Sequence, residues 1–356
     1  MSDGRDTTSS RPEEPPSGYR PSITRTSNNP EPHRIDAVTM QQIADTLREA
    51  DSVLLVAHVN PDADALGSTL ATAIALETIG VPVRVTFPDD PFDVPPGLRF
   101  LPRQDLLVDP ELAQAEVVMS MDASSPDRIG RVLPIGQAAS AFIAVDHHAS
   151  FVPFAQINLC DAAQPATGML ALDLIDALGV DLSRDIAVCL YAAISSDTGS
   201  FRYPATTPDA MRAAARLMDT GIDFAAIAKT MFDTKSRAFI ALQSAVMADL
   251  EIRTVAGFTV AIAQVPAQAR QDRGIAFTEV EALIDAVRTV ADVDVALVLK
   301  QDDHGVWRVS SRSTGGADVG AVCTRVGGGG HRLAAGFTGS NDAEETLNRF
   351  LEALAA

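Results

Sequence analysis

The stretch SVLLVAHVNPDADALGS at residues 52–68 passes from a short apolar run through a polar turn into a helix. Its first six residues, Ser52–Ala57, are apolar and rich in β-branched side chains, which predicts a buried strand. The turn that follows carries one imidazole and two carboxylates, from His58, Asp62 and Asp64. In open α/β sheets, ligands collect beyond the carboxyl ends of the strands. This stretch therefore predicts both an α/β fold and a place for its site.

Other apolar runs alternate with helical patterns along the first part of the chain. A short apolar run between turn residues predicts a buried strand, and apolar residues spaced three or four apart predict a helix. This alternation is typical of a mostly parallel sheet flanked by helices. We therefore predict an α/β first domain. Further strands are expected over Val81–Phe87, Ala115–Met121 and Ala141–Val145, and helices over Val38–Ala50, Asp64–Ile79, Thr167–Leu178, Arg184–Ser195 and Pro208–Thr220.

The pattern changes after about residue 230, where a helix is followed by strands joined by short turns. This order predicts a second, smaller α+β domain. Residues 1–36 are rich in Pro, Ser and Thr and poor in large apolar residues, so we expect a disordered tail there. The predicted boundaries are the tail over 1–36, a catalytic domain over 37–210, a helical connector over 211–250 and a substrate-binding domain over 251–356. The second domain is expected to have strands over Ile252–Val255, Phe258–Gln264, Val293–Lys300 and Gly305–Ser311, and the expected helices are Ser236–Leu250, Phe277–Val290, Ala317–Val326 and Asp342–Ala355.

Composition excludes several classes of protein. The 356 residues carry 28 Lys and Arg against 47 Asp and Glu, a formal charge of −19, which argues against coating long nucleic acid. The chain has no apolar run of roughly 18 residues and no secretory signal, so we expect a cytoplasmic protein with no membrane span. Cys160, Cys189 and Cys323 lack CxxC spacing, and we expect them to be reduced and buried.

Acidic residues recur directly after predicted strands. Asp122 follows one strand, Asp146-His147-His148 follows the next, and Asp197 follows a helix. A loop residue or a helix N-cap explains one such Asp, but not a repeated placement beside histidines. Carboxylates and imidazoles without thiolates suit Mn²⁺, Mg²⁺, Fe²⁺ or Co²⁺ better than a structural Zn²⁺ site. Two such ions, about 3.5–4 Å apart, fit phosphoester hydrolysis, in which they activate a bridging hydroxide.

Four motifs together resemble those of the DHH phosphoesterase superfamily. They are HVNPDADALGS at 58–68, MDASSPD at 121–127, VDHHAS at 145–150 and SSDTGSF at 195–201. The C-terminal part resembles the DHHA1 domain through Ser311-Arg-Ser and the glycine-rich run at 327–336. The chain is most similar to the bacterial nanoRNase and pAp-phosphatase branch, which includes actinobacterial members acting on linear and cyclic dinucleotides. One departure is Ala63, where many members carry Gly.

The resemblance implies a two-metal hydrolase of short oligonucleotides (roughly two to five nucleotides), of 3′-phosphoadenosine 5′-phosphate (pAp), and also of cyclic-di-AMP or pApA. It implies two Mn²⁺ ions per chain, with Mg²⁺, Co²⁺ or Fe²⁺ as alternatives. Asp122 would bridge the ions, His148 would contact the scissile phosphate or protonate the leaving oxygen, and Asp146 would orient a histidine. One ion would be held by His58, Asp62 and Asp122, and the other by Asp64, Asp122, His147 and Asp197.

The second domain is expected to hold the substrate across an active-site cleft from the metal ions. Backbone N–H groups of a glycine-rich loop can cradle a phosphate, and a guanidinium can bind a terminal phosphate with two hydrogen bonds. A flexible linker is the alternative for the glycines, and an exposed strand end is the alternative for Arg312. The expected substrate-binding residues are Arg312, Ser313, Gly328, Gly329, Gly330 and His331.

Three other functions remain open from the sequence. A single-strand exonuclease of the same superfamily would carry an extra basic domain, which this chain lacks. A family II inorganic pyrophosphatase has a different second domain, and a nucleotide-binding sensor would not need every metal-site side chain. The expected partners are short RNA and nucleotides, with no long duplex and no membrane. A homodimer formed through helices of the first domain is an expectation at the level of the family.

Overall fold

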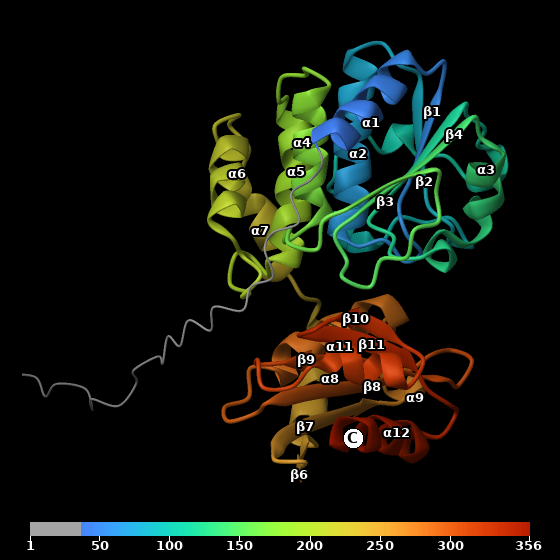
Figure 1. Cartoon of the computed structure of the whole chain (residues 1–356). Helices are drawn as coiled ribbons and strands as arrows, with labels where there is room; N and C mark the ends of the chain where they lie inside the picture. The colour runs from blue at the N-terminus through green and yellow to red at the C-terminus, as the bar shows by residue number, and fades with distance from the viewer. Residues whose placement is uncertain (1–36) are drawn as a thin grey trace, which may run out of the picture. The chain divides into compact units, whose positions relative to one another are not determined.

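A five-stranded sheet forms the centre of the first half of the chain (Figure 1). The computed structural model describes residues 37–356, so the disordered tail predicted at 1–36 lies outside the described residues. The strand order is β2-β1-β3-β4-β5, and every neighbouring pair is parallel, which confirms the predicted α/β class. The strands are β1 (Val53–Val56), β2 (Val83–Thr86), β3 (Val117–Met121), β4 (Ala141–Asp146) and β5 (Ile157–Cys160).

Helices cover both faces of this sheet (Figure 1). Successive side chains of a strand point to opposite faces, so Leu55 joins Leu66 in one core while Leu54 joins Phe142 in the other. Burial on both faces is the reason that the strands are continuous apolar runs in the sequence. The Leu55 face carries α1 (Ala37–Glu49), α2 (Ala63–Thr78), α4 (Thr167–Ala177) and α5 (Arg184–Asp197), with α6 (Pro208–Met218) and α7 (Phe224–Phe232) beside α5, and the other face carries η4 (Pro126–Val132) and α3 (Leu133–Ala138).

Helices α2 and α5 approach each other closely at Gly67. A Cβ on Gly67 would lie 2.6 Å from the carbonyl oxygen of Cys189 and 3.2 Å from the Cβ of Ala193. A side chain there would force the two helices apart, which explains the glycine in the motif that follows β1. Since Asp64 is in the first turn of α2 and Asp197 ends α5, this contact also controls how these two carboxylates meet.

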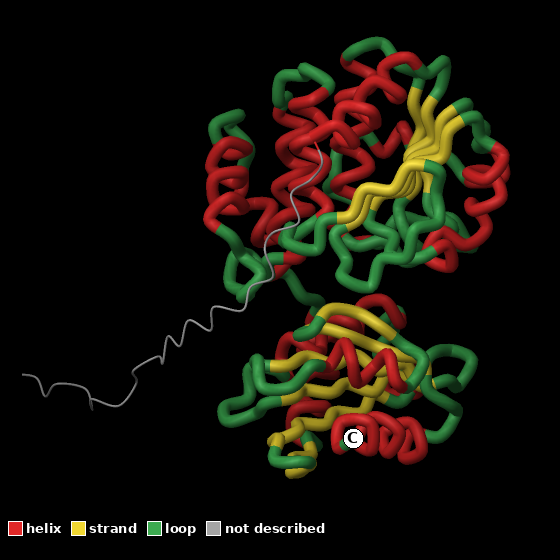
Figure 2. Tube along the Cα trace, in the orientation of Figure 1, coloured by secondary structure: helices red, strands yellow, loops and turns green. Residues whose placement is uncertain are grey.

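A six-stranded mixed sheet forms the second half of the described chain (Figure 2). Its order is β10-β11-β9-β8-β7-β6, and β7 with β8 is its one parallel pair. Helices α8, α9 and α10 pack on one face, and α11 and α12 pack on the other. Both sheets belong to one compact unit. The elements are α8 (Arg237–Ala248), β6 (Glu251–Val255), β7 (Phe258–Val265), α9 (Ala267–Gln271), η5 (Phe277–Ala282), α10 (Leu283–Val287), β8 (Val295–Gln301), β9 (Trp307–Ser313), α11 (Val319–Arg325), β10 (Gly329–His331), β11 (Ala334–Thr338) and α12 (Ala343–Ala355).

Some predicted features differ from the structure. The helix expected over Phe277–Val290 is divided into the 3₁₀ helix η5 and the short helix α10, because the buried apolar positions define a face but not how tightly the chain winds. The prediction that all three cysteines are buried is wrong for Cys160, which is exposed on the edge strand β5. The short strand β5 and helix α7 were not predicted.

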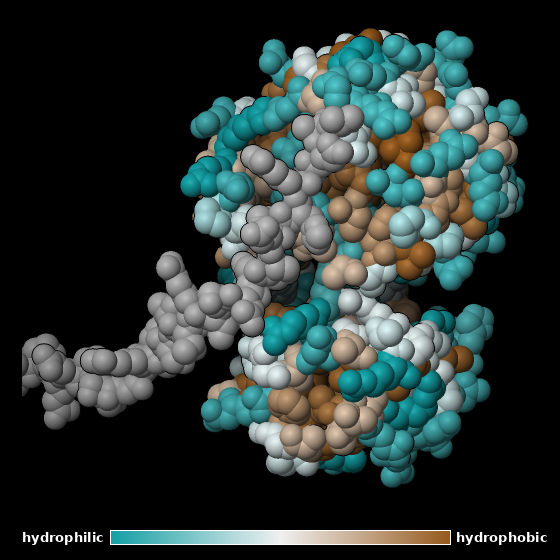
Figure 3. Space-filling model, in the orientation of Figure 1, coloured by the Kyte–Doolittle hydropathy of each residue, from teal (hydrophilic) through white to brown (hydrophobic). Residues whose placement is uncertain are grey.

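The surface on one side of the molecule is mixed in character (Figure 3). On the face drawn in Figure 3, hydrophobic residues occur among hydrophilic ones. None of the helices that the structure describes is both long and apolar enough to cross a bilayer. The domain boundaries at residues 210 and 250 and the cleft between the domains stay predictions.

Candidate metal centre

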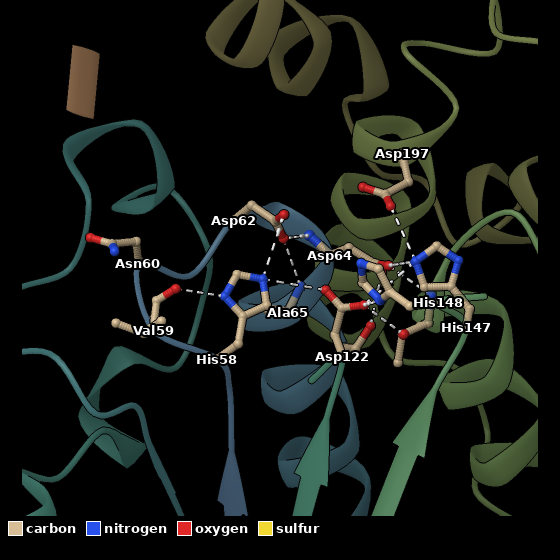
Figure 4. A network of polar contacts seen from close by, with 12 residues as sticks. His58, Val59, Asn60, Asp62, Asp64, Ala65, Asp122, His147, His148 and Asp197 are labelled. Carbon is tan, nitrogen blue, oxygen red and sulfur yellow. Dashed lines mark hydrogen bonds and ion pairs between the residues drawn. The ribbon is translucent and has the colours of Figure 1, made fainter. Parts of the chain in front are cut away.

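The turn after β1 fixes the orientation of His58. Two backbone hydrogen bonds anchor this turn, from the N–H of Val59 to the carbonyl oxygen of Arg128 at 2.8 Å and from the N–H of Asn60 to the carboxylate of Asp89 at 2.9 Å. Asn60 has a φ of +50°, in the left-handed region that Asn tolerates. The Nδ1–H of His58 donates to the carbonyl oxygen of Val59 at 2.8 Å, which leaves Nε2 facing the acidic residues (Figure 4).

The N-terminus of α2 supplies Asp62 and Asp64. Asp62 is the N-cap, and its Oδ1 accepts the N–H groups of Asp64 and Ala65 at 3.0 Å each. A helix cap therefore explains one of these carboxylates. Asp64 is fully buried and accepts the N–H groups of Thr167 and Gly168, at the start of α4, at 2.7 and 2.8 Å. Both carboxylates are thus held rigidly by backbone donors.

Two strand ends and one helix end supply the remaining side chains. Asp122 directly follows β3, Asp146 ends β4 and is followed by His147 and His148, and Asp197 is the last residue of α5. Because β3 and β4 are parallel, their carboxyl ends lie at the same edge of the sheet. The side chains from all these elements point toward one another at that edge (Figure 4).

His147 lies at the centre of three carboxylates. Its Nε2 is 3.3 Å from Oδ2 of Asp197, 3.6 Å from Oδ1 of Asp122 and 3.7 Å from Oδ2 of Asp64. One ligand atom from each of Asp64, His147 and Asp197 lies within 4.8 Å of the other two. The structure therefore brings together the whole predicted second ligand set.

His58 forms the matching first set with Asp62 and Asp122. Its Nε2 is 3.7 Å from Oδ2 of Asp62 and 3.6 Å from Oδ2 of Asp122. Asp122 thus presents Oδ2 to His58 and Oδ1 to His147. This is the position expected for a carboxylate shared between two neighbouring cations.

Both histidines of the DHH triplet are oriented through Nδ1. Nδ1 of His147 lies 3.2 Å from the carbonyl oxygen of Gln164, and Nδ1 of His148 lies 2.8 Å from Oδ1 of Asp146. A carbonyl oxygen only accepts, so the neutral form of His147 carries its proton on Nδ1, and in that form Nε2 can act as a ligand. Asp146 is fully buried, as suits a carboxylate that orients an imidazole.

Negative charge is in excess in this cluster. Burial alone would lower the pKa of His147, but the carboxylates of Asp197, Asp122 and Asp64 outweigh it and raise that pKa well above its ordinary value. Burial raises the pKa of Asp64 well above its usual range, and the negative charges of Asp122 and Asp197 add to the effect. Burial also raises the pKa of Asp122. The cluster therefore attracts positive charge.

The donor set fits divalent cations. Nε2 of His147 is buried and has no hydrogen-bond partner among the described residues, although buried polar atoms normally find one. Donors that bind one cation at about 2.1 Å lie roughly 3–3.5 Å apart. The separations around His147, 3.3–3.7 Å, are longer than good hydrogen bonds and within a few tenths of an ångström of this spacing, as suits a shared cation. Oxygen and imidazole donors without thiolates favour Mn²⁺, Mg²⁺ or Fe²⁺.

His331 is the one predicted substrate-binding residue whose contact with the cluster is direct. Its ring centroid lies 4.5 Å from that of His148, with the two rings stacked, and 5.2 Å from that of His147. Burial, together with the positive charges of His148 and His147, lowers the pKa of His331 to about 4, so this imidazole is neutral at pH 7.

The glycines before His331 have a packing role in the structure. A Cβ on Gly328 would lie 2.2 Å from the carbonyl oxygen of Gly336, and one on Gly330 would lie 2.6 Å from that of Ala334. Gly329 begins the short strand β10, where a loop was predicted, and has open space beside it. The close approach of β10 to β11 therefore accounts for two of the three glycines that were predicted to bind substrate.

The other two predicted substrate-binding residues lie in β9. Arg312 is partly buried, and its guanidinium donates to the carbonyl oxygen of Ser311 at 3.0 Å. The hydroxyl of Ser313 accepts the N–H groups of Gly315 and Ala317 at 3.2 and 3.3 Å, so it stabilises the following turn. Substrate binding by Arg312 and Ser313 stays a prediction.

Two groups that support the cluster were not predicted. Thr167 contacts Asp64 and Asp122, and Asp89 holds the turn after β1 through the N–H of Asn60. Both come from segments far from the motifs in sequence. For Thr167, the one signal in the sequence was a Thr followed by a Gly at a predicted helix start, and this pattern is common at helix N-termini.

Two family models match the chain. The DHH family N-terminal domain matches residues 52–194, and the DHHA1 domain matches residues 257–356. The chain is also 31% identical over 332 residues to the bifunctional oligoribonuclease and PAP phosphatase NrnA of Thermus thermophilus, an alignment that covers 92% of this chain and 96% of that protein.

Solved structures share the fold. A crystal structure of an exopolyphosphatase-related protein from Bacteroides fragilis has a TM-score of 0.81 and 23% identity, and covers 90% of this chain and 97% of that chain. The crystal structure of RecJ in complex with Mn²⁺ from Thermus thermophilus has a TM-score of 0.51 and 14% identity, and covers 90% of this chain and 55% of that chain.

Proposed function

This chain belongs to the DHH family, with a DHH N-terminal domain followed by a DHHA1 domain, and from this premise we propose that it is a metal-dependent phosphoesterase that hydrolyses short oligonucleotides and pAp. The observation that carries the proposal is the buried Nε2 of His147, which lies among three carboxylates and has no hydrogen-bond partner in the described part of the chain. The Thermus relative, which is named for both activities and is matched over nearly its whole length, supports this substrate class.

Two divalent cations, Mn²⁺ in our proposal, would be held by the two ligand sets that share Asp122. When bound, such ions supply a hydroxide at neutral pH and neutralise charge on the phosphate. The residues of this chain keep the donor atoms in place: Asp64 through the N-terminus of α4, and His147 through Gln164. The two sets are His58, Asp62 and Asp122, and Asp64, Asp122, His147 and Asp197.

His148 is proposed to contact the scissile phosphate or to protonate the leaving oxygen. Burial alone would lower its pKa, but the carboxylates of Asp146 and Asp122 outweigh it and leave the pKa raised. A raised pKa favours the protonated imidazole, which is the form that a general acid needs. Oδ1 of Asp146 accepts a hydrogen bond from Nδ1 of His148, so Nε2 of His148 points away from the Asp146 carboxylate.

The DHHA1 domain is proposed to bind the end of the substrate that is not cleaved. His331 stacks on His148, so its strand β10 lies close to the proposed reacting phosphate. Arg312 is the proposed partner of a terminal phosphate, because a guanidinium binds phosphate through two parallel hydrogen bonds. The formal charge of −19 disfavours long nucleic acid and thereby favours short substrates.

Turnover of a substrate panel by the purified protein tests this proposal. With Mn²⁺, we expect hydrolysis of pAp, pApA and RNA dinucleotides, with products separated by chromatography, and a slower reaction on long single strands. Cyclic-di-AMP belongs in the panel as the narrower part of the proposal. Asp122→Asn should lower kcat/KM by about 10²-fold or more, because it removes the charge shared by both ligand sets.

Asp127→Ala is the matched control, since Asp127 is exposed and five residues from Asp122 in the same segment. It should leave kcat/KM unchanged. Full activity of Asp122→Asn, or equal activity with and without a chelator, would refute the proposal.

A further inference from the structure

Thr167 contacts two carboxylates of the cluster at once. Its backbone N–H donates to Oδ2 of Asp64 at 2.7 Å, and its hydroxyl donates to Oδ1 of Asp122 at 2.8 Å. Thr167 is fully buried. It is therefore the residue through which the N-terminus of α4 reaches both ligand sets.

Hydrogen bonds to Asp64 hold the start of helix α4, where Thr167 lies. Its N-cap, Ala166, has an extended backbone and no side chain that can cap the helix. The first N–H groups of a helix have no partner within the helix, and here Asp64 accepts those of Thr167 and Gly168. The positive end of the helix dipole favours a negative charge at this position. Asp64, which belongs to α2, thus takes the place of a capping side chain for α4.

Asp122 needs such an anchor. Its φ of +62° lies in the left-handed region, which costs a non-glycine residue roughly 1–3 kcal/mol. Its backbone is held by the hydrogen bond from its N–H to the carbonyl oxygen of Val145 at 2.9 Å. The terminal torsion of an Asp carboxyl has broad preferences, so the backbone alone does not decide which way the two oxygens face.

The direction of these oxygens matters because Asp122 serves both ligand sets. Its Oδ2 faces His58 at 3.6 Å, and its Oδ1 faces His147 at 3.6 Å. The hydroxyl of Thr167 binds Oδ1. A rotation of the carboxyl group would break this hydrogen bond and turn both oxygens away from the histidines.

We propose that Thr167 is a positioning residue whose hydroxyl fixes the carboxylate plane of Asp122, so that one oxygen faces each ligand set. This inference rests on the proposed metal centre and deepens it. Loss of a group that orients a metal ligand typically weakens metal binding by about 10–100-fold. We expect a loss of that size when the hydroxyl is removed and the shape of the side chain is kept.

Three substitutions at Thr167 separate the hydroxyl from the shape of the side chain. Thr167→Val keeps the shape and removes the hydroxyl, while Thr167→Ser and Thr167→Ala both lose the methyl group but only Ser keeps the hydroxyl. Mn²⁺ affinity is measured by titration of the full-length protein, with free Mn²⁺ followed by electron paramagnetic resonance. We expect about 10–100-fold weaker binding in Thr167→Val and Thr167→Ala, and in Thr167→Ser an affinity close to that of the unaltered protein. KM for pApA at saturating Mn²⁺ should stay the same.

Thr69→Val is the matched control. Thr69 is buried in α2, and its hydroxyl donates only to the backbone carbonyl oxygens of Ala65 and Leu66. It should bind Mn²⁺ as the unaltered protein does. If Thr167→Val does not melt cooperatively, the comparison of Thr167→Ser with Thr167→Ala still decides the question.

Unchanged Mn²⁺ affinity in Thr167→Val and Thr167→Ala would overturn the inference. A loss of Mn²⁺ affinity in Thr167→Ser as large as that in Thr167→Ala would also overturn it, because the methyl group would then be the cause. An effect on KM for pApA alone would place Thr167 at the substrate instead. Failure of the unaltered protein to bind Mn²⁺ would be a different result, since it would refute the proposed metal centre itself.

Discussion

Replacing Gly67 with alanine tests whether the close packing of α2 on α5 positions the cluster. The new Cβ would lie 2.6 Å from the carbonyl oxygen of Cys189, which belongs to the backbone of α5 and cannot swing away as a flexible side chain would. Ordinary contact requires the helices to separate by at least about half an ångström. Asp197 is four residues after Ala193, the second residue that the Cβ would meet, so it would move with α5 away from Asp64.

The expected effect on stability is modest, and the effect on activity is larger. Alanine in place of glycine in a helix gains about 1 kcal/mol, while overpacking costs about 1–3 kcal/mol. The net loss of about 1 kcal/mol should lower Tm by roughly 2–4 °C. Since a misplacement of about 1 Å at a reacting centre can cost 10²-fold, a shift of half that size should lower kcat/KM about tenfold.

Thermal unfolding followed by circular dichroism and steady-state kinetics on pApA at saturating Mn²⁺ measure these effects. Gly97→Ala is the control, because a Cβ on Gly97 meets nothing within 4 Å. It should leave both Tm and kcat/KM nearly unchanged. If Gly67→Ala matched Gly97→Ala in both measurements, the argument that this contact positions Asp64 and Asp197 would be wrong.

Three further outcomes are expected. Arg312→Ala should raise KM or lower kcat on pApA, and unchanged kinetics would dismiss its role at a terminal phosphate. Free Mn²⁺ at about 100 times its Kd should raise the free energy of unfolding by about 2.7 kcal/mol over the protein in chelator, measured by thermal melting, whereas equal melts would contradict cation binding. Burial of Asp302 opposes its ionisation, but hydrogen bonds from the Val306 N–H and from Arg308 outweigh this and lower its pKa. The stabilisation from Asp302 is therefore complete above the ordinary carboxyl pKa and is lost as pH falls through the lowered pKa. Asp302→Ala should thus lower the free energy of unfolding in urea by about 1–2 kcal/mol at pH 7, and by less near pH 3. The same difference at both pH values would refute this.

The cluster was predictable because it follows from topology. Parallel strands end at one edge of the sheet, so polar residues directly after apolar runs must meet there. Asp122, Asp146 and His147 could be grouped in this way from their positions in the sequence alone. The apolar runs were clear signals for the same reason, since burial on both faces leaves no polar residue inside a strand such as β1.

The supporting contacts were not predictable because they join segments far apart in the chain. Thr167 is 45 residues from Asp122, and its role depends on α4 starting at the edge where β3 ends. The glycines before His331 carried a second ambiguity. A run of glycine is typical of a phosphate-binding loop, of a flexible linker and of two backbones in close contact. Only the pairing of β10 with β11 shows that Gly328 and Gly330 meet the last condition.

The charge of the cluster indicates that it is built for binding rather than for stability. Burying ionised groups costs free energy unless opposite charge and hydrogen bonds compensate, and even a fully paired buried set is often no more stable than apolar residues would be. Here the carboxylates of Asp64 and Asp122 are buried together, and protons partly supply the missing positive charge, as their raised pKa values indicate. The backbone N–H groups at the start of α4 and the hydroxyl of Thr167 hold these carboxylates in place against their mutual repulsion. Where helix-terminal donors keep like charges together in this way, the gain in free energy is largest when cations replace the protons. The buried negative charge that makes this edge costly in the free protein is therefore what favours divalent cations in the proposed metal centre.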